Sequence, residues 1–265
     1  MYKVGFIGLG NMGYAILKGL LRTDSKDNFT FTEISDERKS ALSKELNVKY
    51  SNNNIELIKN SKYIVLAVKP QVYKEVMEEI KEYLTPENII ITIAPGFDIN
   101  TVKLLLGSNV RVVRSMPNTP ALVGEGMSAV CFSDDKFENK EIEDIKNIFL
   151  SFGEIEILEE KLMDAIVPIS GSSPAYIYML IEAMADGGVL MGLPRKLAYK
   201  LASQSVLGSA KMVLETNTHP GELKDAVCSP GGTTIEAVAT LEKYNFRSSI
   251  IEAMTSAYNK AKNMK

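Results

Sequence analysis

Cysteine and histidine are scarce in this chain of 265 residues. Cys131 and Cys228 lack the CxxC spacing of a metal or redox motif, and His219 is the single histidine. Such isolated residues do not make a zinc cluster or a disulfide framework. The sequence therefore predicts neither a bound metal nor a disulfide-stabilised fold.

Long apolar runs and blocks of basic charge are also missing. No stretch reaches the roughly 18 uninterrupted apolar residues of a membrane span, and the amino terminus has a strand pattern where a secretory leader would have a charged and then an apolar region. The 30 basic and 33 acidic residues give a net charge of −3, with no Lys/Arg-rich stripe for a phosphate backbone. We expect a cytoplasmic protein that binds neither membranes nor nucleic acid.

Short β-branched runs alternate with helix-period segments through about the first 150 residues, which predicts a parallel sheet wrapped by helices. Tyr63–Val68 and Ile89–Ile93 are almost wholly apolar, as strands covered on both faces are, and belong in the sheet centre. The expected strands are Lys3–Ile7, Phe29–Glu33, Tyr63–Val68, Ile89–Ile93, Val110–Arg114, Met127–Phe132 and Glu154–Leu158.

Beyond about Glu160 the strand signal stops and only helical segments follow. We expect an α/β domain over residues 1–160, with a doubly wound Rossmann-type sheet, and an all-α domain over residues 161–265. Residues 176–191 are apolar on nearly every face, which a surface helix of a monomer is not. This segment is therefore expected to be buried between helices of two subunits.

The sequence Gly8-Leu9-Gly10-Asn11-Met12-Gly13 follows the first strand and opens an amphipathic helix. In a dinucleotide fold, Gly8 makes the tight turn, Gly10 lets the backbone approach a pyrophosphate, and Gly13 lets helix and strand pack closely. A GxGxxG pattern alone is weak, but the strand before it and the helix after it favour dinucleotide binding over a purely structural turn.

Glu33 lies twenty residues after Gly13, where a dinucleotide fold places the acid that binds the ribose of NAD. Such an acid would repel the 2′-phosphate of NADP. Ser35, Arg38 and Lys39 follow and could form a phosphate pocket, so the sequence argues both ways and favours NAD only slightly. A solvated loop charge is the simpler alternative for Glu33.

Further loops follow the carboxyl ends of strands, the edge at which doubly wound sheets bind ligands. Ala67–Gln71 and Ala94–Gly96 are expected to wall the ribose and the nicotinamide, although Lys69-Pro70 also suits an ordinary turn. Met116–Pro120 is placed similarly. Ser170–Ala175 opens the apolar helix and is either a simple helix start or a segment that passes beside the nicotinamide.

The run Ser229-Pro230-Gly231-Gly232-Thr233-Thr234-Ile235 joins a tight turn to a helix start that carries two hydroxyls. Backbone N–H groups at such a start can receive a small carboxylate. The sequence therefore predicts that these N–H groups and the hydroxyls of Thr233 and Thr234 bind a small carboxylate.

Several segments resemble the pyrroline-5-carboxylate reductase family, in order along the whole chain. They are GFIGLGNMG from Gly5, AVKPQ from Ala67, MPNTP from Met116, SGSSPAY from Ser170, DGGVLMGLPR from Asp186 and HPGELKDAVCSPGGTTIEAVATLE from His219. The resemblance implies reduction of 1-pyrroline-5-carboxylate to L-proline with NADPH or NADH, and helical dimers that can stack into decamers.

Carried over by position, the resemblance implies cofactor contacts at Phe6, Ile7, Gly8, Leu9, Gly10, Asn11, Asn54, Ala67, Val68, Lys69, Pro70 and Pro95. Thr233 and Thr234 correspond to the family's proline-binding pair, and the resemblance implies that Ser229, Gly231, Gly232, Thr233 and Thr234 bind the substrate. The N–H groups of Gly231, Gly232 and Thr233 would hold its carboxylate, and the Thr234 hydroxyl, the implied catalytic group, would hydrogen-bond its ring nitrogen. Two departures stand out. Asn217 occupies a position where some relatives have glutamate, and Glu33-Ile34-Ser35 replaces a polar run that receives the 2′-phosphate.

The scarcity of histidine suits this reaction, because a cyclic imine can arrive already protonated and then needs only a hydride and a hydrogen bond at nitrogen. A β-hydroxyacid dehydrogenase of the same architecture would need a lysine early in the helical domain, but Lys161 precedes the SGSSP turn. A non-catalytic dinucleotide sensor would be expected to lose the SPGGTT loop, which is intact here.

Overall fold

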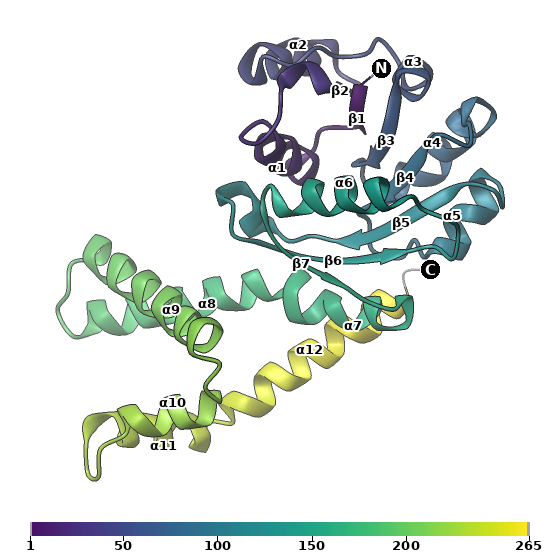
Figure 1. Cartoon of the computed structure of the whole chain (residues 1–265). Coiled ribbons are helices and arrows are strands. Elements are labelled where there is room, and N and C mark those ends of the chain that lie inside the picture. Colours follow the sequence, from purple (N-terminus) through teal and green to yellow (C-terminus); the bar gives the residue numbers. More distant parts are fainter. Residues whose placement is uncertain (1, 264–265) are drawn as a thin grey trace. The chain divides into compact units, whose positions relative to one another are not determined.

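The computed structural model describes residues 2–263, which form two compact units (Figure 1). The first unit runs to Ser172 and includes the chain again from Ala257, and the second holds Ser173–Ser256. Helix α12 (Phe246–Lys262) therefore begins in the second unit and ends in the first.

A seven-stranded sheet organises the first unit, in the order β2-β1-β3-β4-β5-β6-β7. The strands are β1 (Tyr2–Ile7), β2 (Phe29–Thr32), β3 (Ser61–Leu66), β4 (Ile89–Thr92), β5 (Arg111–Met116), β6 (Gly126–Phe132) and β7 (Gly153–Ile157). All seven predicted strands are confirmed, and the two apolar ones, β3 and β4, lie inside the sheet.

One pairing differs from the expected parallel sheet: β6 runs antiparallel to β5, whereas every other pair is parallel. The cause lies in the connection between the two strands, which holds only a short 3-10 helix at Thr119–Val123. A parallel crossover needs about a dozen residues or more. The chain therefore turns back on itself at this point.

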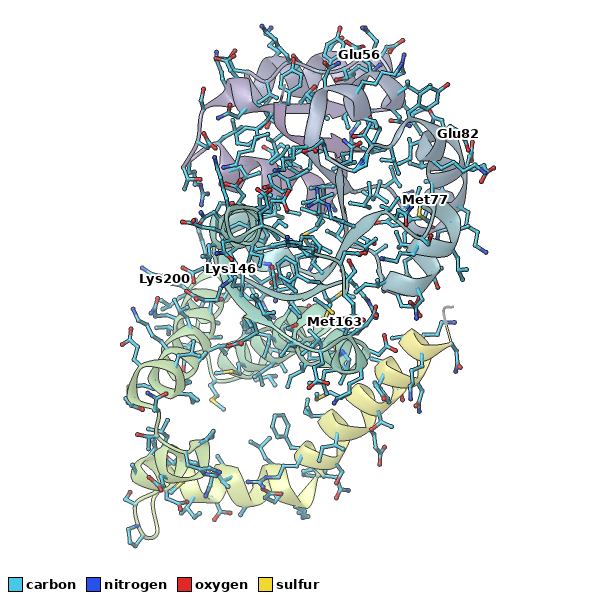
Figure 2. The ribbon with its side chains drawn as sticks, turned by 45° about the vertical axis from the view of Figure 1, so that its right-hand side comes forward. Glu56, Met77, Glu82, Lys146, Met163 and Lys200 are labelled. Carbon is cyan, nitrogen blue, oxygen red and sulfur yellow. The ribbon has the colours of Figure 1, made fainter. Side chains whose placement is uncertain are left out.

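Helices cover both faces of the sheet and create two hydrophobic cores. The helices are α1 (Asn11–Leu20), α2 (Asp36–Leu46), α3 (Asn54–Asn60), α4 (Tyr73–Ile80), α5 (Ile99–Leu106), α6 (Asn139–Leu150) and α7 (Met163–Ile166). The side chains of β1 alternate between them, so Phe6 enters the core under α1 and α6, and Ile7 enters the one under α3, α4, α5 and α7. Met77 on α4 is fully buried there, whereas Glu82 projects outward just beyond that helix (Figure 2).

A buried carboxylate ties α6 to the sheet. The Glu141 side chain is 3% exposed and lies 2.6 Å from Nη1 of Arg111 and 2.9 Å from Nζ of Lys62. It also accepts a 3.0 Å hydrogen bond from the N–H of Glu138. Burial opposes ionisation, but these three donors outweigh it and hold the pKa of Glu141 below its usual value.

Glu141→Gln is expected to lower the free energy of unfolding at pH 7 by about 2 kcal/mol, because two charge-assisted hydrogen bonds are weakened. The lowered pKa means that the stabilisation is complete above the unfolded-state pKa of about 4.3 and is lost as the pH falls through the folded-state value. Urea unfolding of both proteins at pH 7 and pH 3 measures this. Exposed Glu143, on the same helix, gives the control Glu143→Gln. An equal loss at both pH values would contradict the electrostatic explanation.

The second unit is helical throughout and has almost no core of its own. Its helices are α8 (Ser173–Leu190), α9 (Arg195–Thr216), α10 (Pro220–Val227), α11 (Thr233–Lys243) and the first part of α12. In α8 and α9 the buried residues are the small Ala185, Ala198 and Ala202, while Met179 is 70% exposed and Leu190 is 89% exposed. Among residues 2–263, no helix is long and apolar enough to cross a membrane.

Candidate active site

The glycine-rich turn between β1 and α1 is shaped by its neighbours. Gly8 has φ of +79°, and an added Cβ would lie 2.6 Å from Cγ1 of Val68. A Cβ on Gly13 would lie 2.8 Å from that of Ala67, so α1 packs closely against the end of β3. A Cβ on Gly10 would come no closer than 3.7 Å to the non-neighbouring atoms around it. The space beside Gly10 is therefore open to a ligand.

Gly10 is also the N-cap of α1, and within the described chain no side chain makes the cap hydrogen bond there. The first turn of a helix has N–H groups without intrahelical acceptors, and they favour an anion. This turn therefore fits the pyrophosphate of a dinucleotide.

Glu33, just beyond β2, is held against the glycine-rich turn. Its Oε2 accepts a 3.3 Å hydrogen bond from the N–H of Leu9 and lies 3.4 Å from Nε of Arg38. Nη2 of Arg38 donates to the Leu9 carbonyl at 2.9 Å, which completes a clamp between the acid, the arginine and the turn. The Glu33 side chain is only 16% exposed. It is therefore not the freely solvated loop charge of the simpler interpretation.

The polar residues after Glu33 are engaged with one another. Ser35 caps α2 by accepting a hydrogen bond from the N–H of Arg38 at 3.2 Å. Nζ of Lys39 lies 2.9 Å from Oδ1 of Asp36 and 5.6 Å from the centre of the Tyr50 ring. The structure thus places the candidate phosphate-binding groups in the first turn of α2, each with a partner from the protein.

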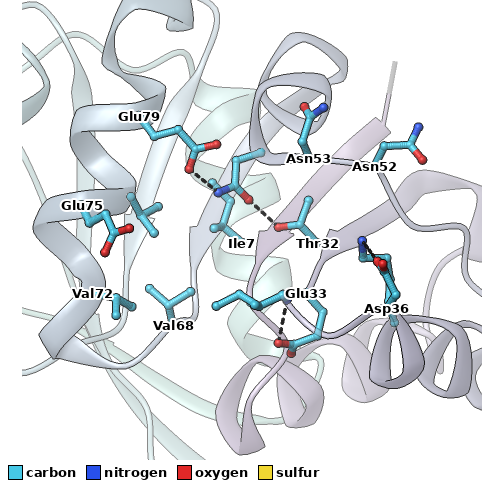
Figure 3. A pocket seen from close by; sticks show the side chains of 15 residues that line it. Ile7, Thr32, Glu33, Asp36, Asn52, Asn53, Val68, Val72, Glu75 and Glu79 are labelled. Atoms are coloured by element: carbon cyan, nitrogen blue, oxygen red, sulfur yellow. Dashed lines mark hydrogen bonds and ion pairs between the residues drawn. The ribbon is translucent and has the colours of Figure 1, made fainter.

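Asn54 opens α3 and connects Thr32, at the end of β2, with Glu79 on α4; Figure 3 labels these two partners. Its Oδ1 accepts from the Thr32 hydroxyl at 2.7 Å, and its Nδ2 donates to Oε2 of Glu79 at 2.8 Å. All three residues line a cavity of about 470 Å³ at the carboxyl ends of β1, β2 and β3. Its other lining residues are Ile7, Gly8, Glu33, Ile34, Asp36, Lys39, Asn52, Asn53, Val68, Val72, Glu75 and Val76.

A second cavity, of about 410 Å³, lies on the other side of the glycine-rich turn. It collects residues from the turn and from the loops after β3 and β4, as expected for the ligand edge of a doubly wound sheet. Its lining residues are Gly10, Asn11, Met12, Arg38, Ala67, Val68, Lys69, Pro70, Ile93, Ala94 and Pro95. Val68 lines both cavities, so the two together could hold the halves of one dinucleotide.

Two residues of the predicted cofactor set, Phe6 and Leu9, have side chains that cannot reach a ligand. The side chains of Phe6 and Leu9 are fully buried in the core beneath α1, so only their backbone atoms could touch a ligand. The sequence interpretation overlooked Thr32, Glu75 and Glu79. The only available signal was the i, i+4 spacing of the two acids on α4, and that spacing does not reveal which loop the helix faces.

The turn before α11 is built much as the sequence suggests. Gly231 has φ of +67°, and Gly232 is the N-cap of the helix with no side-chain cap hydrogen bond from the described residues. The Gly232 N–H, which was expected to face the carboxylate, donates to the Ser229 carbonyl at 3.0 Å and closes the turn. The helix geometry instead offers the N–H groups of Thr233 and Thr234.

Asn217 and His219 both serve local structure. Asn217 ends α9 with φ of +51°, a left-handed conformation that asparagine adopts more readily than glutamate. His219 caps α10, where its Nδ1 accepts from the N–H of Gly221 at 3.0 Å.

The Met116–Pro120 segment is fixed by Asn118, which is 8% exposed. Its side chain donates to the Ser170 carbonyl at 3.0 Å and accepts from the N–H of Met127 at 2.9 Å.

Lys161 does not have the surroundings of the catalytic lysine that a hydroxyacid dehydrogenase would require. Its side chain is 71% exposed, and its Nζ lies 2.5 Å from Oε2 of Glu159. No group of three or more His, Cys, Asp or Glu within residues 2–263 could hold a metal.

A Rossmann-type sheet, a glycine-rich turn with an open helix start and two adjoining ligand cavities define an NAD(P)-dependent oxidoreductase. Residues 3–96 match the family model "NADP oxidoreductase coenzyme F420-dependent", and residues 160–264 match "Pyrroline-5-carboxylate reductase dimerisation". The second match is to a dimerisation domain, in the part of the chain that exposes apolar helices.

The relatives are similar over the full length. Pyrroline-5-carboxylate reductase of Escherichia coli is 44% identical, covering 99% of this chain and 98% of the relative. The enzyme of Methanosarcina acetivorans is 40% identical, covering 99% and 97%. A crystal structure of the Plasmodium falciparum pyrroline carboxylate reductase with NADP bound superposes with a TM-score of 0.90 at 35% identity, covering 99% and 98%. The chain belongs to the pyrroline-5-carboxylate reductase family.

Proposed function

We propose that this chain reduces 1-pyrroline-5-carboxylate to L-proline by hydride transfer from NAD(P)H, the last step of proline biosynthesis. The observation that carries the proposal is the open helix start at Thr233, preceded by the Ser229–Gly232 turn, in a chain that also has a dinucleotide-type glycine turn. One helix start suits a small carboxylate and the other a pyrophosphate.

The proposed cofactor contacts divide between the two cavities. Glu33 and Asn54 belong to the cavity beside β2, the end that binds the adenosine ribose in this fold. Ser35 is also assigned to the cofactor site, where it acts by capping the start of α2 beside Glu33. The other cavity has the loops after β3 and β4, which suit the nicotinamide. Its predicted residues are Gly10, Asn11, Met12, Ala67, Val68, Lys69, Pro70 and Pro95.

We assign the substrate carboxylate to the N–H groups at the start of α11. Gly231, in its left-handed conformation, orients the turn, and the helix start presents Thr233 and Thr234. Thr234 is the proposed catalytic residue, because its hydroxyl accepts a hydrogen bond from the protonated ring nitrogen. Ser229 and Gly232 hold the turn closed.

The reaction needs little proton chemistry from the protein. The bound nicotinamide supplies a hydride, which forms a C–H bond at the imine carbon while the π electrons of C=N move to the protonated nitrogen. No acid must deliver a proton to the reacting bond, so the contribution of the chain is position and orientation. A site with hydroxyl and backbone N–H groups is sufficient for this chemistry.

The proposed organisation follows the same division. Residues 1–160 bind the dinucleotide, and residues 161–265 bind the substrate and pair with a second copy. The exposed side chains of Met179 and Leu190 support a homodimer as the active unit, because a stable helix does not leave so much apolar surface in water. Stacking of dimers into a decamer and a cytoplasmic location remain predictions.

The test is a comparison of initial rates of NADH and NADPH oxidation with pyrroline-5-carboxylate, with pyruvate and with the oxo acids that correspond to simple hydroxyacids. We expect oxidation only with the cyclic imine. Equal rates with the imine and with a carbonyl substrate would contradict the proposal and favour a hydroxyacid dehydrogenase. Cofactor binding without turnover of any of these substrates would favour a sensor.

A further inference from the structure

The 470 Å³ cavity that Asn54 lines has an acidic wall. Four carboxylates line it, those of Glu33, Asp36, Glu75 and Glu79 (Figure 3). Lys39 is the one basic side chain among the described residues of the lining. The charge of Lys39 is offset by the ion pair with Asp36. A cavity of this kind has a negative potential, whereas a pocket for a phosphate needs positive charge or free donors.

Arg38, the other nearby base, is directed toward the second cavity. Its guanidinium contacts Oε2 of Glu33 through Nε and the Leu9 carbonyl through Nη2, at 3.4 and 2.9 Å. It lines the cavity on the other side of the glycine turn and is absent from the lining of the acidic one. To meet a 2′-phosphate, Arg38 would have to leave Glu33 and strand that partly buried carboxylate beside the same phosphate.

Glu79 determines how Asn54 faces the cavity. Because Glu79 accepts from Nδ2 and Thr32 donates to Oδ1, the amide of Asn54 is held by partners on both of its polar atoms. Glu79 is exposed, so its charge also acts directly on whatever enters the cavity. It thus has two effects that can be separated: a hydrogen bond that glutamine can imitate and a charge that glutamine lacks.

We propose that Glu79, acting with Glu33, makes this enzyme prefer NADH to NADPH. The 2′-phosphate of NADPH adds about −1.5 to −2 charge units, and the acidic wall repels it. The ribose hydroxyls of NADH instead meet carboxylates that accept hydrogen bonds. The family model that matches residues 3–96 carries NADP in its description. The proposed preference for NADH is therefore argued from this chain's own side chains and not from the family match. The inference rests on the proposed function for the identity of the cofactor.

The experiment measures dissociation constants of NADH and NADPH by nucleotide fluorescence, without substrate, for the wild type, Glu79→Gln and Glu33→Ser. The wild type is expected to bind NADH about tenfold more tightly, which corresponds to about 1.4 kcal/mol. Glu79→Gln should tighten NADPH by about threefold to fivefold and change NADH by less than about twofold, since glutamine still accepts from Asn54. Glu33→Ser should change the ratio of the two dissociation constants by about tenfold in favour of NADPH.

Salt and a matched variant separate charge from structure. Raising the ionic strength from 0.05 to 0.5 M is expected to reduce the ratio of the NADPH to the NADH dissociation constant of the wild type by about twofold or more. The reduction should be smaller in Glu79→Gln, because salt screens only the charge repulsion and this variant has less of it. Glu79→Ala should weaken NADH by releasing the Asn54 amide, whereas for NADPH the loss of repulsion should offset this weakening. Glu82→Gln, an exposed acid just beyond α4 that does not line the cavity, should change neither constant.

Equal affinities for the two cofactors in the wild type, or an unchanged ratio in Glu79→Gln, would overturn the inference. A failure of the proposed function looks different: both cofactors would bind in the expected ratio, but pyrroline-5-carboxylate would not be reduced. Conversely, reduction of pyrroline-5-carboxylate at equal kcat/KM with NADH and NADPH would support the proposed function and contradict the proposed preference for NADH.

Discussion

Thr234→Ala is expected to lower kcat/KM for pyrroline-5-carboxylate by about 10- to 150-fold, because it removes a charge-assisted hydrogen bond of about 1.5 to 3 kcal/mol at the reacting nitrogen. The dissociation constant of the cofactor should stay the same. Thr234→Ser should keep most of the activity, since it retains the hydroxyl. Steady-state kinetics and cofactor titration of the three proteins measure these effects.

The rival explanation makes Thr234 a structural residue at the start of α11. The structure gives the N-cap position to Gly232 and places Thr234 one residue inside the helix, so alanine should not lower the melting temperature. Thr240→Ala is the matched control on the same helix, because the Thr240 hydroxyl donates to the Glu236 carbonyl. A lower melting temperature with unchanged kcat/KM per folded molecule would defeat the catalytic role.

Gly10→Ala is expected to weaken NADH and NADPH alike by about 100-fold, or about 2.7 kcal/mol, because the new methyl group occupies the space through which the backbone approaches the pyrophosphate. The fold should tolerate it, since the nearest non-neighbouring atom would be 3.7 Å from the added Cβ. Fluorescence titration reports the affinity and thermal unfolding reports the stability.

Gly8→Ala, two residues earlier, should behave in the opposite way. Its Cβ would lie 2.6 Å from Val68 in a backbone conformation with φ of +79°, so the main loss should be stability, by about 2 kcal/mol or more. If Gly10→Ala binds both cofactors normally, the glycine turn does not hold the pyrophosphate.

The sheet could be predicted from the sequence because its signals are local. Apolar strands such as Tyr63–Val68 are recognisable wherever they occur, and the glycine spacing marks the turn after β1. The strand β6 was predicted, but its antiparallel direction was missed because the residue pattern of a strand does not contain its direction. In that case the shortness of the connection from β5 was the physical signal.

The acidic wall shows what a local pattern cannot reveal. Glu33 was predicted from its distance along the chain from Gly13, but its engagement with Leu9 and Arg38 depends on side chains that meet only in the folded unit. Glu79 is 46 residues further on, one exposed acid among several on α4. Only the hydrogen bond to Asn54 distinguishes it from its neighbours.

The scarcity of buried side chains in α8 and α9 ties the stability of the helical unit to the amount of protein present. A segment that gains its core only from another copy melts at a temperature that rises with concentration, because dilution favours the separated chains. Substitutions at Met179 or Leu190 would then act as changes in an association constant. Their harm would be mild in a cell that makes much of the enzyme and severe in one that makes little.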